Sequence, residues 1–262
     1  MTARNEDIMS IHYQSDQGVA TLTFDRPAKK NAITAEMYEQ FVAGLAQAAA
    51  DDSVRALLVA GAGGTFTAGN DLKDFSNPKF AQADSPVISF MQGLAAFEKP
   101  VIAAVQGMAV GIGVTMLLHC DLVYAADDAT FSMPFTNLGL VPEFASTLLL
   151  PQVSGRARAA EKLLLGKPFP AAEAVVMGIA NAVLPSAGVV AHAQKVARMF
   201  SALPPGAVRD TKKLLRQPQA AAVKETILRE ASYFGPRLAG DEAREAISAI
   251  LEKRAPDFSK FR

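Results

Sequence analysis

The chain has 262 residues, half of them hydrophobic, and its 26 lysines and arginines balance its 26 aspartates and glutamates. This length and hydrophobicity suffice for a full buried core, and the zero net charge argues against a nucleic-acid or membrane surface. Cys120 is the single cysteine of the sequence, so no disulfide can form within the chain.

Short hydrophobic runs predict a series of strands. Residues 20–24 alternate hydrophobic and polar side chains, which indicates a strand with one buried face. Most of the later runs are continuously hydrophobic, as in strands that are buried on both faces. The expected strands cover residues 20–24, 56–60, 101–105, 122–125 and 182–184.

Helices are expected between these strands. Thr34 can cap a helix whose hydrophobic positions recur every four residues from Met37 to Leu45. Another helix is expected over residues 90–97. The polar segment before it, residues 76–86, contains proline and serine and is expected to form a mobile loop.

The second half of the chain becomes increasingly helical. Pro170 and Gly178 stand where one helix is expected to begin and end. The clearest break is Pro-Pro-Gly at residues 204–206, and three helical segments follow it. We therefore expect a mixed α/β core over residues 1–200 and a helical region over residues 201–262. The stripe of Ile247, Ile250 and Leu251 in this region is expected to pack against other subunits of a trimer.

Two glycine-containing segments are the most informative features of the sequence. They are residues 68–72, Ala-Gly-Asn-Asp-Leu, and residues 106–113, Gln-Gly-Met-Ala-Val-Gly-Ile-Gly, and each comes after an expected strand. The second is expected to open a long hydrophobic helix, whose first N–H groups have no partner within the helix. Two loops that each present a free N–H group can hold an oxygen that becomes negative during a reaction.

Other sequence motifs give little support to alternative functions. A dinucleotide-binding loop would need a third glycine where Met116 stands, and the sequence has no Gly-x-Ser-x-Gly or Walker motif. His12, His119 and His192 are too widely separated for a typical metal site. Residues 101–118 are long enough to span a membrane, but their glycines favour a strand, a turn and a helix that are buried in the protein.

The glycine loops belong to a longer series of short segments. The series is Asp25-Arg26-Pro27, Asn31-Ala32, Ala68 to Leu72, Gln106 to Gly113, Cys120-Asp121, Phe131-Ser132 and Leu138 to Glu143. In order and spacing it resembles the crotonase superfamily, the enoyl-CoA hydratases and isomerases, over essentially the whole chain. The resemblance implies an α/β fold, namely a spiral of ββα turns with a C-terminal helical part, assembled as homotrimers or hexamers. It also implies an acyl-CoA substrate, with no metal and no cofactor apart from the CoA of the substrate.

The resemblance assigns roles to individual residues. The oxyanion donors fall at the backbone amides of Asn70 and Ile112, which agrees with the two loops inferred above. Hydratases of the family use two glutamates to position and activate water, and those positions here hold Thr115 and Phe135. Neither side chain can exchange a proton near neutral pH, which argues against simple hydration of a 2-enoyl-CoA.

Glu143 offers another base. It lies in residues 138–146, which resemble the segment that carries the catalytic glutamate in a group of Δ3,Δ2-enoyl-CoA isomerases. Hydrophobic neighbours such as Leu140 and Phe144 would raise its pKa by desolvation. Alternatively, Pro142 and Glu143 open a helix whose dipole the carboxylate faces, and the sequence allows both interpretations at once.

Substrate contacts are also implied by the resemblance. Family members hold CoA mainly through backbone groups, and basic side chains near these groups could meet its phosphates, although simple solvation explains each of them as well. In relatives, a C-terminal lysine that matches Lys253 reaches the CoA of a neighbouring subunit. The expected substrate-binding residues are Arg26, Lys29, Ala68, Leu72, Phe135 and Lys253.

The favoured function is therefore that of an enoyl-CoA isomerase of fatty acid β-oxidation, with Glu143 moving a proton from C2 to C4 of a 3-enoyl-CoA. Hydration with one glutamate, another thioester reaction, and an inactive acyl-CoA-binding protein remain as alternatives. The polar N-terminus has no hydrophobic signal core, and the terminal Ser-Lys-Phe-Arg is no peroxisomal signal, so the cytoplasm is the expected location.

Overall fold

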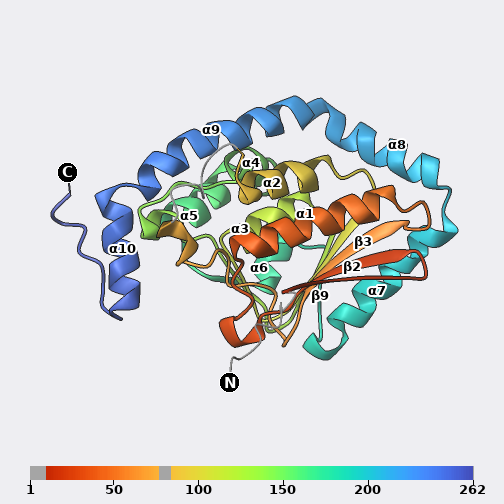
Figure 1. Cartoon of the computed structure of the whole chain (residues 1–262), viewed down its shortest axis with the longest axis horizontal. Coiled ribbons are helices and arrows are strands. Elements are labelled where there is room, and N and C mark those ends of the chain that lie inside the picture. Colours follow the sequence, from red (N-terminus) through yellow and green to blue (C-terminus); the bar gives the residue numbers. More distant parts are fainter. Residues whose placement is uncertain (1–9, 77–83, 262) are drawn as a thin grey trace, which may run out of the picture.

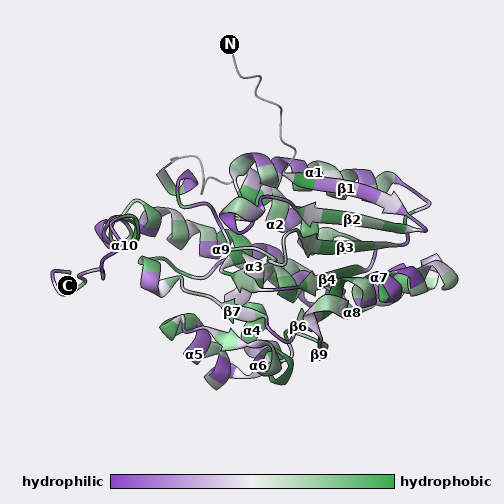
Figure 2. Ribbon diagram, turned by 90° about the horizontal axis from the view of Figure 1, so that it is seen from below, coloured by the Kyte–Doolittle hydropathy of each residue, from purple (hydrophilic) through white to green (hydrophobic). Residues whose placement is uncertain are grey.

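The computed structural model describes residues 10–76 and 84–261. Its main sheet has six strands in the order β1-β2-β3-β4-β6-β9 (Figures 1 and 2). β1 and β2 form an antiparallel hairpin, and each later strand pairs in parallel with its neighbour. The strands are β1 (Ile11–Asp16), β2 (Val19–Phe24), β3 (Ala56–Gly61), β4 (Val101–Val105), β6 (Leu122–Ala126) and β9 (Ala182–Leu184).

A second, three-stranded sheet lies alongside the first and has the order β5-β7-β8. Its strands are β5 (Met108–Val110), β7 (Thr130–Ser132) and β8 (Phe169–Pro170). β5 follows β4 and β7 follows β6 after short turns, so the chain passes repeatedly from the first sheet to the second. This repeated step produces a spiral. The sequence analysis did not predict these three strands, each of which is only two or three residues long.

The central strands are buried on both faces, as their continuous hydrophobic sequences predicted. Leu57 and Val59 of β3 face the main core, whereas Leu58 and Ala60 face the opposite side. Helix α1 (Ala35–Ala50) and helix α2 (Pro86–Ala96) pack together over the first face, and α7 (Val189–Met199) covers the second. The green strands between amphipathic helices in Figure 2 show the same layering.

Most of the expected helices are confirmed. Thr34 caps α1 by accepting a hydrogen bond from the backbone N–H of Met37 at 3.4 Å. The remaining helices of the first part of the chain are α3 (Ile112–Thr115), α4 (Ser146–Ser154), α5 (Arg156–Leu165) and α6 (Ala171–Val176). Short 3-10 turns cover Pro27–Lys29, Asp74–Ser76, Met116–His119, Thr136–Leu138, Ser186–Gly188, Phe200–Ala202 and Gln217–Gln219.

One expected helix differs in length, and one expected loop falls largely outside the described residues. The segment after Gly111 was expected to be a long hydrophobic helix, but α3 is a single turn that tightens into the 3-10 turn Met116–His119. Of the proposed loop at residues 76–86, residues 77–83 lie outside the described part of the chain, and α2 begins at Pro86.

The C-terminal helices arch over the rest of the molecule (Figure 1). They are α8 (Pro205–Arg216), α9 (Ala220–Leu238) and α10 (Asp241–Leu251). α8 is fastened to the core by Lys212, whose Nζ donates to the Lys99 carbonyl at 2.6 Å and pairs with Asp121 at 2.7 Å. The helical region therefore packs closely on residues 1–200, and a boundary near residue 200 remains an interpretation of the sequence.

Among the helices of residues 10–76 and 84–261, not one is both long and hydrophobic enough to cross a bilayer.

Candidate active site

Glu143 lies in an irregular segment just before α4. The helix begins at Ser146 and its N-cap is Ala145, so the interpretation of Glu143 as a first-turn carboxylate was wrong. Its side chain points instead to α3, where the hydroxyl of Thr115 donates a hydrogen bond to Oε1 at 2.6 Å. The other oxygen, Oε2, is buried and has no hydrogen-bond partner among the described residues.

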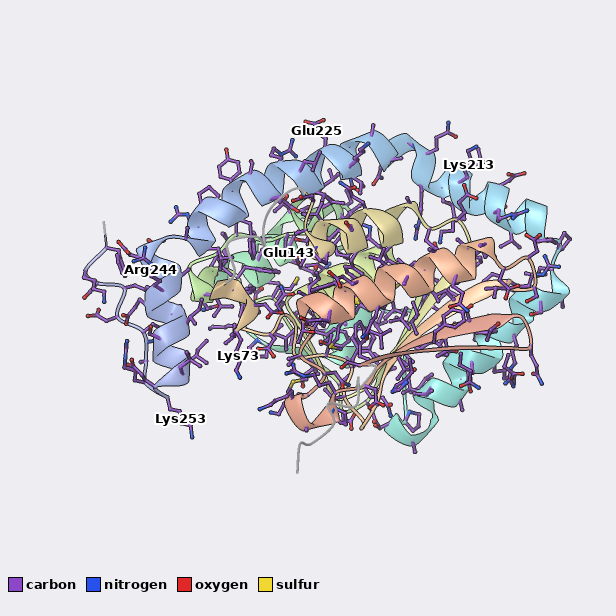
Figure 3. The ribbon with its side chains drawn as sticks, viewed as in Figure 1. Lys73, Glu143, Lys213, Glu225, Arg244 and Lys253 are labelled. Atoms are coloured by element: carbon purple, nitrogen blue, oxygen red, sulfur yellow. The ribbon has the colours of Figure 1, made fainter. Side chains whose placement is uncertain are left out.

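This carboxylate lines a small hydrophobic cavity between α2 and α9. Asn70 lies on the same cavity, so the structure brings together the base and one of the expected oxyanion residues. In Figure 3, Glu143 is seen below α9 and close to α2. The other lining residues are Val87, Ile88 and Met91 of α2 and Ile227, Ala231 and Phe234 of α9.

The surroundings of Glu143 change its proton affinity. Burial raises its pKa from the usual value to about 8, the hydrogen bond from Thr115 opposes this rise, and the charge of Glu230 adds to it. A carboxyl group whose pKa lies near neutrality can both accept and return a proton at physiological pH. The expected desolvation of Glu143 is therefore present, with Thr115 as an additional influence.

The two glycine loops lie side by side. Thr67 and Ala109 form an isolated parallel bridge, in which Thr67 N donates to Met108 O at 3.0 Å and Val110 N donates to Thr67 O at 3.1 Å. A Cβ atom on Gly69 would lie 2.7 Å from Val110 O, and the φ of Gly69 is +84°. Only glycine fits both the contact and the conformation, so this residue permits the close approach of the loops.

The amides of Asn70 and Ile112 have free N–H groups in the described part of the chain, because neither donates to another of its residues. Ile33 fixes the first loop, since Ile33 N donates to Gly69 O and Asp71 N donates to Ile33 O, each at 2.8 Å. The side chain of Asn70 is held as well, because its Oδ1 accepts a hydrogen bond from Tyr38. Several hydrogen bonds therefore hold the Asn70 turn, which suits a donor that must be preorganised.

Phe135 is buried beside the second loop. Its ring edge would lie 3.9 Å from a Cβ atom placed on Gly111. At the two positions where hydratases carry glutamates, the structure thus has a hydroxyl that contacts Glu143 and a hydrophobic ring.

The expected CoA-binding residues differ in how much they already contact the rest of the protein. The guanidinium of Arg26 already makes contacts within the protein, because its Nη1 pairs with Asp71 at 2.6 Å and donates to Ala32 O at 3.1 Å. This contact ties the Arg26 loop to the first glycine loop, a role that the sequence analysis did not foresee. Lys29 is exposed nearby, and a contact of either side chain with CoA stays a prediction.

Two backbone positions near the first loop and one distant lysine complete this set. Ala68 N donates to Lys30 O at 2.9 Å, and both Ala68 and Leu72 are partly buried. Lys253 is exposed at the far end of α10, well away from Glu143 in the same chain (Figure 3). It therefore takes no part in the site of its own subunit.

Glu230 of α9 is a residue of the site that the sequence analysis missed. Its buried carboxylate accepts hydrogen bonds from Ala145 N at 2.6 Å, Thr147 N at 2.9 Å and the Thr147 hydroxyl at 2.6 Å. It thus caps α4 from another helix. A charged residue on the hydrophobic face of α9, between Ile227 and Phe234, was the sequence signal that could have revealed it.

The cap stabilises an unusual backbone next to Glu143. Phe144 and Ala145 both have left-handed conformations, with φ values of +62° and +57°. Each such residue costs about 1–2 kcal/mol, so the segment needs compensating contacts. The hydrogen bonds from Ala145 and Thr147 to Glu230 provide them and fix the point from which the Glu143 side chain extends.

Replacing Glu230 by alanine is therefore expected to destabilise the protein by about 2 kcal/mol, because the buried N–H of Ala145 and the N–H and hydroxyl of Thr147 lose their acceptor. Urea unfolding measures this change. Glu225→Ala is the matched control, since Glu225 lies on the outer surface of the same helix (Figure 3). Equal midpoints for the two variants would contradict the role given to Glu230.

Known proteins share this architecture. The family model described as enoyl-CoA hydratase/isomerase matches residues 14–261. OdaA of Pseudomonas aeruginosa is 46% identical, with a TM-score of 0.90 over 92% of this chain and 98% of that one. An enoyl-CoA hydratase/isomerase from Pseudoalteromonas atlantica is 40% identical, with a TM-score of 0.90 over 95% and 99% of the two chains.

Similar sequences include isomerases. The chain is 37% identical to the 1,2-epoxyphenylacetyl-CoA isomerase of Escherichia coli, over 93% of its own length and 96% of the enzyme. It is 34% identical to the enoyl-CoA delta isomerase 2 of Rattus norvegicus over 95% of its own length, but it spans only 65% of that enzyme. The spiral fold with its C-terminal helices is thus of the crotonase type, as the resemblance implied, and the chain belongs to the enoyl-CoA hydratase/isomerase family of the crotonase superfamily.

Proposed function

We propose that this family member is an isomerase that converts a 3-enoyl-CoA into a 2-enoyl-CoA. Glu143 takes a proton from C2, and the electrons of the C–H bond form a dienolate whose negative charge rests on the thioester oxygen. The amides of Asn70 and Ile112 donate hydrogen bonds to that oxygen. The carboxyl group then returns the proton at C4, which leaves the double bond between C2 and C3.

The observation that carries this proposal is the buried carboxylate of Glu143, with one oxygen held by Thr115 and the other unpaired, in the cavity that Asn70 also lines. An inactive acyl-CoA-binding protein would have no need for such a group. A hydratase would need a second acid or base, and Phe135 stands where the family places it. Relatives at 34% identity include both an enoyl-CoA delta isomerase and a 2,3-dehydroadipyl-CoA hydratase, so the choice rests on the side chains of the site.

The proposal requires only the CoA thioester and no separate cofactor. It also includes a trimer or hexamer, because α10 buries its alanines against its own chain and leaves Ile250 and Leu251 48% and 70% exposed. In such an assembly Lys253 could reach the CoA of a neighbouring subunit. Sedimentation at micromolar concentration should give a trimer or hexamer, and a monomer at all concentrations would oppose this part of the proposal.

The pH dependence of isomerisation tests the proposal. Glu143 must be ionised to take the proton, so kcat/KM should rise with pH, by about tenfold per unit well below the pKa. The rise should level off near the pKa of about 8 that burial gives to this carboxyl. The measurement is the appearance of 2-enoyl-CoA from 3-enoyl-CoA as a function of pH.

Thr115→Val is the matched variant for the dependence of kcat/KM on pH. Its hydroxyl stabilises the ionised carboxylate, so its removal should move the apparent pKa of Glu143 further upward. A flat profile for the unmodified protein, or a midpoint near the ordinary pKa of glutamate, would contradict the assignment of Glu143 as the base.

A further inference from the structure

His119 is a buried histidine that lies next to the site but has no task in the proposed reaction. Its ring is stacked on the ring of Phe144, with the centroids 4.0 Å apart and the planes at 18°. Its Nε2 lies 2.8 Å from the backbone oxygen of Phe144. A carbonyl oxygen can only accept a hydrogen bond, so Nε2 carries the ring proton and is the donor.

The surroundings of His119 keep its ring neutral. Burial lowers its pKa from the usual value to about 4, the hydrogen bond to Phe144 opposes this change, and the charge of Arg216 adds to it. A neutral imidazole has a single N–H group, and the contact with Phe144 uses it. The histidine is therefore a fixed donor and takes no part in proton transfer near neutral pH.

Phe144, the residue directly after Glu143, is one that must be held in place. Its φ of +62° is uncommon for a bulky side chain and costs energy unless other contacts compensate. Phe90 of α2 also contacts the Phe144 ring, with the centroids 5.6 Å apart and the planes at 64°. Both the ring and the carbonyl group of Phe144 are thus fixed by contacts with other elements.

The segment that ends at His119 also carries two other groups of the site. It consists of α3 and the 3-10 turn that follows, and it begins with the amide of Ile112, the second proposed oxyanion donor. In its middle, the hydroxyl of Thr115 donates to Oε1 of Glu143 at 2.6 Å. One short segment therefore presents an oxyanion amide and contacts both the side chain of the proposed base and the residue after it.

The end of this segment is anchored in turn. Nη2 of Arg216, from α8, donates to the backbone oxygen of His119 at 2.5 Å and to Asp121 at 2.9 Å. The imidazole thus extends from a backbone that is itself held, as a residue that fixes the position of another must be.

We propose that His119 is a positioning residue for the base, whose Nε2–H group holds the Phe144 carbonyl and so keeps the carboxylate of Glu143 in register with the oxyanion amides. The base must reach C2 while the amides reach the thioester oxygen of the same substrate, and a misplacement of about 1 Å can cost about 100-fold in rate. This inference rests on the proposed isomerase function, but it concerns a residue to which that proposal gives no part.

Three substitutions of His119 separate its N–H group from its ring. His119→Phe keeps an aromatic ring that can stack on Phe144 and removes the N–H. His119→Gln removes the ring and keeps an N–H near the place of Nε2, because both nitrogens lie two bonds beyond Cγ. His119→Asn has the same amide group one bond too short.

The measurement is the steady-state isomerisation of 3-hexenoyl-CoA. We expect kcat to fall about tenfold or more in His119→Phe and His119→Asn and to stay within about threefold in His119→Gln, with KM within about twofold in all three. His192→Phe is the matched control and should keep both constants, since His192 of α7 contacts Tyr124 on the far face of the main sheet.

Two measurements guard against effects of folding. Calorimetric titration with the saturated hexanoyl-CoA counts the binding sites in each variant, and kcat is expressed per site. Nitrogen NMR of the unmodified protein should show His119 as the neutral Nε2–H tautomer down to about pH 5, with the His119→Gln variant identifying its signals.

The outcomes separate the two proposals. A loss of kcat in His119→Phe and His119→Asn that His119→Gln avoids supports the inference. A normal kcat in a folded His119→Phe or His119→Asn, an equal loss in His119→Gln, or an Nδ1–H tautomer overturns it while the proposed function stands. If the unmodified protein leaves 3-hexenoyl-CoA unchanged, the proposed function fails and the inference fails with it.

Discussion

Replacing Glu143 by glutamine is expected to reduce kcat for isomerisation by about 100-fold or more, the usual effect of losing a general base. Glutamine has nearly the same shape, and its carbonyl oxygen can still accept the hydrogen bond that Thr115 donates to Oε1. The change therefore removes basicity and little else. Steady-state conversion of 3-enoyl-CoA at about pH 8, where Glu143 is partly ionised, measures the loss.

Two further expected results distinguish the loss of a base from a general loss of activity or of folding. Glu225→Gln carries the same chemical change on the exposed side of α9 and should keep full activity (Figure 3). The Glu143→Gln variant should remain folded, because it removes a carboxyl group that burial makes costly to ionise. A normal rate of isomerisation by the Glu143→Gln variant would refute the assignment of Glu143 as the base.

The second large effect concerns hydration. Adding water to a 2-enoyl thioester requires a water on the correct face and a proton delivered to C2, and the oxyanion amides supply neither. Thr115 can hold a water but cannot deprotonate it near neutral pH, and its hydroxyl is already bonded to Glu143. Phe135 is buried and hydrophobic. Each missing acid or base should cost a factor of about 10²–10⁴.

The kcat/KM for hydration is thus expected to lie far below that for isomerisation of a substrate of the same chain length. Phe135→Glu offers a gain-of-function comparison, since it restores a carboxyl group at the position where the hydratases have one. A faster hydration than isomerisation by the unmodified protein would mean that Thr115 and Phe135 do not disable that reaction.

Local sequence patterns predicted the parts of the fold that depend on neighbouring residues. The continuous hydrophobic runs of β3 and β4 required burial on both faces, and Thr34 capped α1 as its hydroxyl and position suggested. The short strands of the second sheet depend on pairing between distant segments, for example Thr130 with Met108, and leave little local signal.

The residues of the candidate site divide in the same way, into those that local sequence revealed and those that only distant contacts bring together. The glycine loops and Glu143 were recognisable because the residue types and their spacing carry chemistry. The contact between Thr115 and Glu143 joins residues 28 positions apart, and that between Glu230 and Ala145 joins residues 85 apart. Both arise from packing of α3 and α9 around the loop before α4. Thr115 consequently appeared inert in the sequence, whereas in the structure it orients the proposed base.

Apart from Lys253, the C-terminal helices were expected to serve subunit contact, because a hydrophobic stripe on a terminal helix is typical of such a contact. In the structure α9 also supplies Ile227, Ala231 and Phe234 to the cavity at Glu143. Sequence periodicity shows which face of a helix is hydrophobic, but it does not distinguish a face that meets a partner from one that lines a pocket.

The most direct test follows 3-enoyl-CoA and the purified protein over time by mass spectrometry and chromatography, which report water addition and double-bond position together. A single glutamate acting with two oxyanion amides predicts that a 2-enoyl-CoA of unchanged mass accumulates first, while any product heavier by one water forms far more slowly. An unchanged 3-enoyl-CoA, or a hydrated product that forms as fast as the isomer, would contradict the proposed function.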